Sequence, residues 1–125
     1  MKRQVLVVDD NVDDSNMLAQ VVELICHHKA VIATDGAEAI CLAEENDFDL
    51  VLLDLQLPVI EGQDVAKALR QMERYRDIPI IAITAHDMAE ARRQSLQAGC
   101  TVYLNKPIDT QALIDILGAY LPHVK

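Results

Sequence analysis

The chain has 125 residues and a formal net charge of −9, from 20 Asp and Glu against 11 Lys and Arg. This length suits one domain with one hydrophobic core, and the excess of acid would repel the phosphates of nucleic acids and anionic membranes. The longest apolar runs are of strand length and the N-terminus lacks the apolar core of a signal peptide, so we expect a cytoplasmic protein with no membrane or direct nucleic-acid partner.

Five short apolar runs alternate with longer segments whose apolar residues recur at helical spacing. The runs predict strands at 4–8, 30–33, 50–53, 80–83 and 101–104. Residues 5–8, 50–53 and 80–83 are continuously apolar, as in parallel strands that helices cover on both faces. The alternation predicts an α/β fold of five βα units around a parallel sheet. We expect one domain over residues 1–125, with no output domain in this chain.

Apolar spacing and end signals predict the helices. The first is expected to bury a stripe of five residues: Met17, Leu18, Val21, Leu24 and Ile25. The second begins at Asp35 as N-cap, with Glu38 three residues later as in a capping box. The third is expected to bury four residues: Val65, Ala66, Leu69 and Met72.

Two further helices complete the pattern. The fourth, over 88–98 and closed by Gly99, has mostly alanine at its apolar positions, so we expect it to be the most loosely held helix. The last begins at Asp109 and ends before Pro122. It is expected to bury four residues: Leu113, Ile116, Leu117 and Tyr120.

Polar residues follow the predicted strands at their carboxyl ends, where open parallel sheets bind ligands. These residues are Asp9, Asp10, Asp54, Thr84, Asn105 and Lys106. Three carboxylates at one edge repel each other unless a cation joins them. Lys106 supplies one charge, and Mg²⁺ suits a few carboxylates with retained waters. An EF-hand calcium loop starting at Asp9 fails, because Asp14 stands where Gly is needed and Gln20 where Glu belongs.

Asp54 stands among apolar residues in the segment DFDLVLLDLQLP, residues 47–58. An unpaired carboxylate in an apolar setting costs several kcal/mol. A metal, a lysine and a hydroxyl together stabilise phosphoryl groups, and a carboxylate can be the nucleophile that forms an acyl phosphate. The sequence therefore predicts that Asp54 is phosphorylated, with Thr84 and Lys106 beside it.

Four segments closely resemble the receiver domains of two-component response regulators: VLVVDDN, DLVLLDLQLPVIEG, IPIIAITA and AGCTVYLNKPI. The resemblance implies a flavodoxin-like (βα)5 three-layer sandwich with strand order 2-1-3-4-5. It implies phosphorelay signal transduction, in which Asp54 accepts a phosphoryl group from a histidine kinase or a histidine phosphotransfer protein. It implies no enzyme activity beyond self-phosphorylation from small donors and autodephosphorylation.

The resemblance also assigns the metal site. Asp10 would bind Mg²⁺ directly, Asp9 would assist through water, and Asp54 and the backbone carbonyl of Gln56 would complete the protein ligands. Mn²⁺ is expected to substitute for Mg²⁺.

Other residues receive switch and structural roles from the same resemblance. Thr84 and Lys106 would bind phosphoryl oxygens, and Tyr103 matches an aromatic switch position. The bond between Lys106 and Pro107 is expected to be cis, and Pro58 and Gly62 belong to the structural part of the motif. A downstream partner would bind the helix at 88–98, the strand at 101–104 and the last helix, and the protein is expected to be a monomer or weak dimer.

Three alternatives remain at this point. The segment is also similar to receivers excised from hybrid histidine kinases. A magnesium-dependent aspartyl phosphatase would need a second Asp where Gln56 stands. A flavodoxin-like flavin binder would need a loop that attracts phosphate after the first strand, where this chain has DDNVDD.

Overall fold

The computed structural model describes residues 3–57, 59–85 and 89–121. Five parallel strands form one sheet in the order β2-β1-β3-β4-β5, which confirms the predicted topology. The strands are β1 Gln4–Val8, β2 Lys29–Ala33, β3 Leu50–Asp54, β4 Ile80–Thr84 and β5 Val102–Asn105. The last three each include one residue more at the carboxyl end than predicted, so Asp54, Thr84 and Asn105 belong to the sheet itself.

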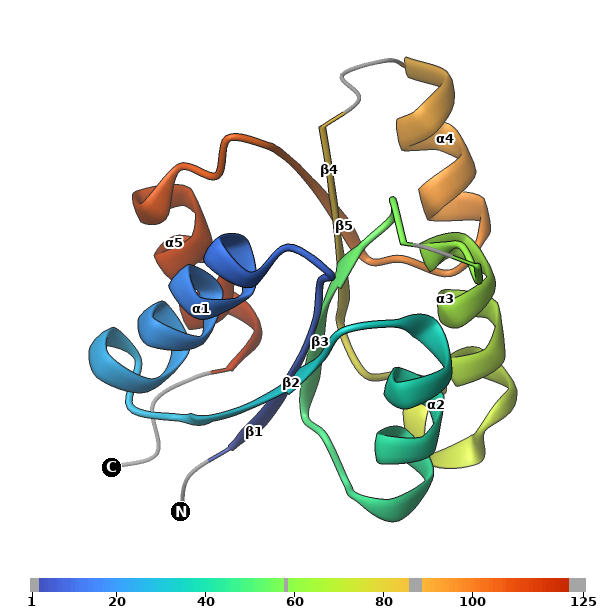
Figure 1. Ribbon diagram of the computed structural model, residues 1–125, viewed down its shortest axis with the longest axis horizontal. Helices are drawn as coiled ribbons and strands as arrows, with labels where there is room; N and C mark the ends of the chain where they lie inside the picture. Colours follow the sequence, from blue (N-terminus) through green and yellow to red (C-terminus); the bar gives the residue numbers. More distant parts are fainter. Residues whose placement is uncertain (1–2, 58, 86–88, 122–125) are drawn as a thin grey trace.

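Helices cover both faces of the sheet and make three layers (Figure 1). The helices are α1 Val12–Gln20, α2 Gly36–Glu45, α3 Gly62–Gln71, α4 Ala89–Gln97 and α5 Thr110–Tyr120. Helix α1 continues as a π-helix, η1 Val21–Ile25, and a 3-10 turn, η2 Glu73–Tyr75, follows α3. Helices α1 and α5 lie on one face, and α2, α3 and α4 lie on the other. Among the described residues no helix has the length and apolarity needed to cross a bilayer.

The continuously apolar strands are explained by these two covered faces. Alternate residues of a strand point to opposite faces. In β1, Leu6 and Val8 join the core beneath α2 and α3, whereas Val5 and Val7 join the core beneath α1 and α5. Every position in the middle of the sheet is therefore buried, and a polar residue there requires a separate explanation.

The predicted helix caps are present. The backbone N–H of Glu38 donates to Asp35 Oδ1 at 2.8 Å, and Asp109 Oδ1 accepts from the N–H of Gln111 at 2.9 Å. The capping box of α2 differs in one contact, because the Glu38 carboxylate accepts from the N–H of Thr34, one residue before the cap, at 2.7 Å. Helix α3 buries Val65, Ala66 and Leu69, and Met72 is partly buried after its end. Met88 and Pro122 lie outside the described residues.

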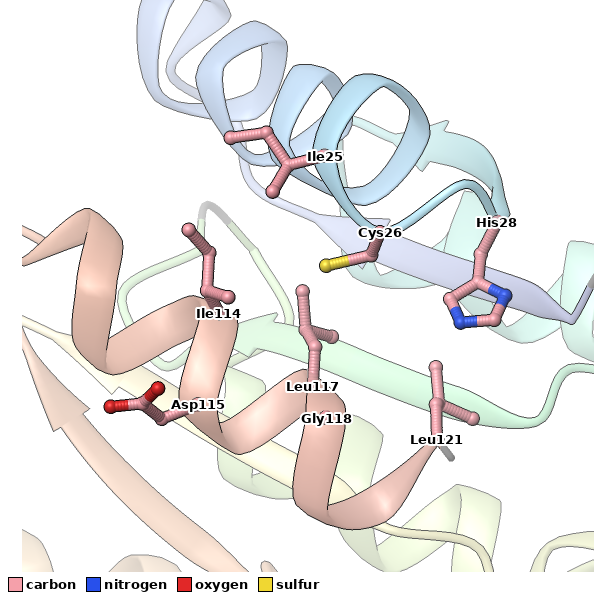
Figure 2. Close-up of a pocket in the computed structure, with 8 residues that line it drawn as sticks. All are labelled: Ile25, Cys26, His28, Ile114, Asp115, Leu117, Gly118 and Leu121. Carbon is pink, nitrogen blue, oxygen red and sulfur yellow. The ribbon is translucent and has the colours of Figure 1, made fainter. Parts of the chain in front are cut away.

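The predicted apolar stripe of the first helix is wrong at its end. Leu24 is 72% exposed and Ile25 is 47% exposed. The last turn is a π-helix, in which the N–H of Cys26 bonds to the carbonyl of Val21. This wider turn changes which side chains face the core, because a π-helix has more residues per turn than the 3.6 of an α-helix. Val22 and Cys26 are buried, and Ile25 lines a cleft of about 310 Å³ beside α5 (Figure 2).

The predicted inner face of α5 is also partly wrong. Leu113 and Leu117 are buried, Ile116 is partly buried, and Tyr120 is 37% exposed. The inward stripe follows the i, i+4 spacing and ends on Leu121, which is 3% exposed. Tyr120 precedes that position by one residue, about 100° around the helix, and so faces outward.

Candidate functional site

Three carboxylates meet at the carboxyl edge of the sheet. Asp9 directly follows β1, and its backbone N–H donates to the carbonyl of Ala33 at 3.1 Å. Asp54 is the last residue of β3, which lies beside β1 in the sheet. Asp9, Asp10 and Asp54 each offer an oxygen, and these oxygens lie within 4.8 Å of one another. The sheet order thus brings Asp54 close to two residues that precede it by 44 and 45 positions in the sequence.

Lys106 lies among these acids. It follows β5, and its backbone N–H donates to the carbonyl of Thr84 at 2.8 Å. Its Nζ lies 3.1 Å from Asp54 Oδ2, 3.2 Å from Asp9 Oδ2 and 2.9 Å from Asp14 Oδ2. The Lys106 side chain is only 18% exposed, so one partly buried ammonium is shared by three carboxylates.

Burial sets the protonation chemistry of the phosphoacceptor candidate. Burial raises the pKa of Asp54 to about 6, against the lowering effect of the Gln56 backbone hydrogen bond, while the charge of Asp9 adds to the increase and Lys106 opposes it. Burial acts to lower the pKa of Lys106, but Asp14, Asp54 and Asp9 together raise it above its ordinary value. Lys106 therefore stays charged, and the acids remain short of positive charge.

The donor set fits a hard divalent cation. Asp9 Oδ2 is buried and has no hydrogen-bond partner among the described residues, although Lys106 Nζ lies 3.2 Å away. Carboxylate oxygens are the ligands that Mg²⁺ prefers in proteins, and Mg²⁺ usually keeps several waters. Asp10 is exposed while Asp9 and Asp54 are buried, so the acidic group opens to solvent on one side.

The loop after β3 holds the Asp54 side chain in place. The backbone N–H of Gln56 donates to Asp54 Oδ1 at 2.9 Å, and Gln56 Oε1 accepts from the N–H of Ala85 in the loop after β4 at 3.4 Å. Gly62 begins α3 directly against this strand end. A Cβ at Gly62 would lie 2.5 Å from the carbonyl oxygen of Asp54, so no larger residue fits without displacing the backbone.

The remaining predicted site residues lie on the neighbouring strands. Thr84 ends β4, is 1% exposed, and pairs in register with Asn105 of β5. Tyr103 is partly buried against the core beneath α2 and α3, and its hydroxyl accepts from Asn105 Nδ2 at 3.3 Å. The bond between Lys106 and Pro107 is cis. Pro58 lies outside the described residues.

One contact at this site could not be predicted from the sequence. Asp14, in the first turn of α1, makes the shortest of the three ion pairs with Lys106. Sequence patterns explain Asp14 fully as an acid at the positive end of a helix dipole. Its pairing with a lysine 92 positions later depends on how α1 and β5 lie in space.

The chain is similar in sequence to a known protein family and to its members. Residues 5–118 match the family model described as the response regulator receiver domain. The polar-differentiation response regulator DivK of Brucella ovis is 35% identical over 121 residues, covering 97% of this chain and 98% of DivK.

Two solved structures are similar as well. The receiver domain of the sensor histidine kinase PA1611 from Pseudomonas aeruginosa PAO1 has a TM-score of 0.88 and 30% identity, covers 98% of this chain and 100% of that chain, and carries a magnesium ion coordinated in its active site cleft. A chain of the Saccharomyces cerevisiae complex between the histidine phosphotransfer protein Ypd1 and the receiver domain of the response regulator Ssk1 has a TM-score of 0.85 and 32% identity, over 95% of this chain and 88% of that chain.

Proposed function

The chain belongs to the response regulator receiver domains of two-component signalling, and we propose that Asp54 is its phosphoacceptor. The observation that carries the proposal is that the buried Asp54 lies within 4.8 Å of carboxylate oxygens of Asp9 and Asp10 and 3.1 Å from the ammonium of Lys106. A buried carboxylate short of positive charge is suited to a reaction that brings a cation and a phosphoryl group together.

The transfer proceeds from a phosphohistidine of a donor protein. One carboxylate oxygen of Asp54 attacks phosphorus, and the bond between phosphorus and the donor imidazole nitrogen breaks. The electron pair of that bond stays on the nitrogen, which takes up a proton, and Asp54 becomes a mixed anhydride. The Gln56 N–H donates to Asp54 Oδ1 at 2.9 Å and the Lys106 ammonium to Asp54 Oδ2 at 3.1 Å, so both carboxylate oxygens are held in place before the reaction.

Asp9, Asp10, Asp54 and the backbone carbonyl of Gln56 would hold a magnesium ion. When bound, it supplies positive charge to the oxygens of the transferring phosphoryl group, and Mn²⁺ substitutes for it. The family relative PA1611 carries magnesium in its active site cleft. The buried Asp9 Oδ2, for which the described residues supply no hydrogen bond, supports the same use here.

The new phosphoryl group adds about 1.5 to 2 negative charges and three acceptor oxygens. Thr84 and Lys106 bind these oxygens. The movement of Thr84 shifts the loop after β4, Tyr103 turns toward the space that opens, and the face formed by α4, β5 and α5 changes. This is a population shift between two states that interact differently with the phosphoryl group.

The phosphodonor is a histidine kinase or a histidine phosphotransfer protein, and a downstream protein binds the α4, β5 and α5 face. Support comes from the relatives, which include a receiver seen with a histidine phosphotransfer protein and a receiver of a sensor histidine kinase. The chain acts as a monomer or weak dimer, and its own chemistry is limited to self-phosphorylation and autodephosphorylation. The alternative within the family is a receiver that belongs to a hybrid kinase.

The test is phosphorylation by acetyl phosphate, followed by intact mass spectrometry. The unaltered chain gains one phosphoryl group in the presence of Mg²⁺ and none with EDTA. Asp54→Asn removes the labelling, whereas Asp64→Asn, an exposed acid in the first turn of α3, keeps it. Magnesium-dependent labelling of Asp54→Asn at the rate of the unaltered chain would refute the assignment.

A further inference from the structure

Lys106 connects two parts of the molecule that are far apart in the sequence. Its Nζ lies 2.9 Å from Asp14 Oδ2 on α1 and 3.1 Å from Asp54 Oδ2 on β3. The contact with Asp14 is the shortest of its three ion pairs. The ammonium thus has one strong partner outside the group of acids that approach one another within 4.8 Å, which are Asp9, Asp10 and Asp54.

Both ends of the contact are held by the backbone. The N–H of Asp14 donates to Oδ1 of Asn11, the N-cap of α1, at 3.0 Å. The N–H of Lys106 donates to the Thr84 carbonyl at 2.8 Å, which ties the residue to the end of β4. The Lys106 side chain is 18% exposed and that of Asp14 is 35% exposed, so solvent screens the pair only in part.

We propose that Asp14 is a positioning residue for Lys106, which holds the ammonium in the unmodified protein and releases it when a phosphoryl group forms on Asp54. This inference rests on the proposed function and adds a residue to it. A lysine has three donors but one charge, and in the unmodified protein three carboxylates share that charge. Each phosphoryl oxygen that approaches Lys106 competes with Asp14 for the ammonium.

The competition has two consequences. Asp14 opposes phosphorylation, because its charge repels an incoming anion and because its ion pair with Lys106 must weaken. Phosphorylation also changes the surface at the first turn of α1, since the Asp14 carboxylate there loses its ion pair with Lys106. This turn belongs to α1, which lies on the same face of the sheet as α5 (Figure 1).

The experiment measures binding of beryllofluoride, a stable mimic of the phosphoryl group, at saturating Mg²⁺ and low ionic strength. Asp14→Asn keeps the shape of the side chain and removes its charge. It should tighten beryllofluoride binding by about two- to fivefold, the range expected for a partly exposed ion pair. The matched control is Asp13→Asn, which removes an equal charge from the neighbouring exposed residue. Within the described part of the chain, the ion pairs of Lys106 are with Asp9, Asp14 and Asp54 and not with Asp13, so this variant should change the affinity by less.

A second measurement uses carbon-detected NMR of the unaltered chain. Adding beryllofluoride should shift the carboxyl carbon of Asp14 and leave that of Asp13 nearly in place. Equal affinities for Asp14→Asn and Asp13→Asn, or a static Asp14 signal, would overturn the positioning role while the proposed function stood. Failure of the unaltered chain to bind beryllofluoride would overturn both together.

Discussion

Polar groups at the amino edge of the sheet are well supplied with hydrogen bonds, whereas those at the carboxyl edge are not. At the amino edge, Arg70 donates to the carbonyls of Tyr75, Arg76, Ile78 and Gly99 and to the hydroxyl of Thr101. The Tyr75 hydroxyl there reaches the carbonyls of Ala43 and Asn46. At the carboxyl edge, three carboxylates share one ammonium, and Asp9 Oδ2 has no hydrogen bond among the described residues.

This difference separates a structural network from a functional one. One cation surrounded by neutral carbonyls satisfies its own hydrogen bonds and theirs, and so adds to stability. Acids held together without enough positive charge lower stability until a ligand arrives. Conflicts of this kind are expected at functional sites and are offset by the rest of the fold.

The largest effect is expected from breaking the amino edge. Arg70→Ala should lower the free energy of unfolding by about 3 kcal/mol, because several partly buried carbonyls lose their donor at once. Urea denaturation measures the change. The control is Arg74→Ala, since Arg74 contacts Asn46 and Asp47 at an exposed position and should cost about 0.5 kcal/mol. Equal losses for the two variants would contradict the structural role of Arg70.

At the carboxyl edge the sign should reverse. In buffer free of divalent ions at pH 7, Asp54→Asn should raise the free energy of unfolding by about 1 to 3 kcal/mol. The upper limit corresponds to moving the pKa of Asp54 from 3.8 to about 6, at about 1.4 kcal/mol per unit. Destabilisation by Asp54→Asn under these conditions would show that the acids at this edge are not in conflict.

The same stabilisation should depend on pH. Because the pKa of Asp54 is raised on folding, the native state holds a proton there that the unfolded state has lost between pH 4 and pH 6. Ionised Asp54 therefore lowers stability above about pH 6, and the cost disappears as the pH falls toward 4. The difference in unfolding free energy between Asp54→Asn and the unaltered chain should therefore shrink as the pH falls from 6 to 4. A difference that grew as the pH fell would contradict the raised pKa of Asp54.

A smaller effect, on coupling rather than stability, is expected at the cation. Lys106→Ala should bind Mg²⁺ within a few-fold of the unaltered chain, because the acids remain. It should fail to pass phosphorylation on to α4, β5 and α5, because the contact between the phosphoryl group and the end of β5 is lost. Amide NMR spectra with and without beryllofluoride measure this, and an unaltered pattern of shifts on those elements would refute it.

The smallest effect is expected at Gln56, whose side chain joins the loops after β3 and β4 through Ala85. Gln56→Ala should change the lifetime of the acyl phosphate by about two- to fivefold, the size expected for one weak exposed hydrogen bond. Decay of labelled protein over time gives the lifetime. An identical decay would leave Gln56 with only its backbone contacts at the site.

The carboxyl edge could be predicted from the sequence and the amino edge could not. Asp9, Asp54 and Lys106 follow apolar runs, and the order of a parallel sheet then brings the strand ends together. Arg70 binds backbone carbonyls, which leave no mark on the sequence, and the Asp14 contact depends on the packing of α1 against the end of β5. Leu24 and Ile25 were wrongly expected to be buried, because an α-helical period was applied to a turn that is a π-helix.

The proposed function requires that a divalent ion relieve the repulsion among Asp9, Asp10 and Asp54 and so prepare Asp54 to react. Calorimetric titration of the folded chain with Mg²⁺ tests it most directly. We expect one binding site per chain, at least tenfold weaker in Asp10→Asn, and an increase in the stability of the unaltered chain when Mg²⁺ binds. No uptake of Mg²⁺, or uptake that Asp10→Asn leaves unchanged, would contradict it.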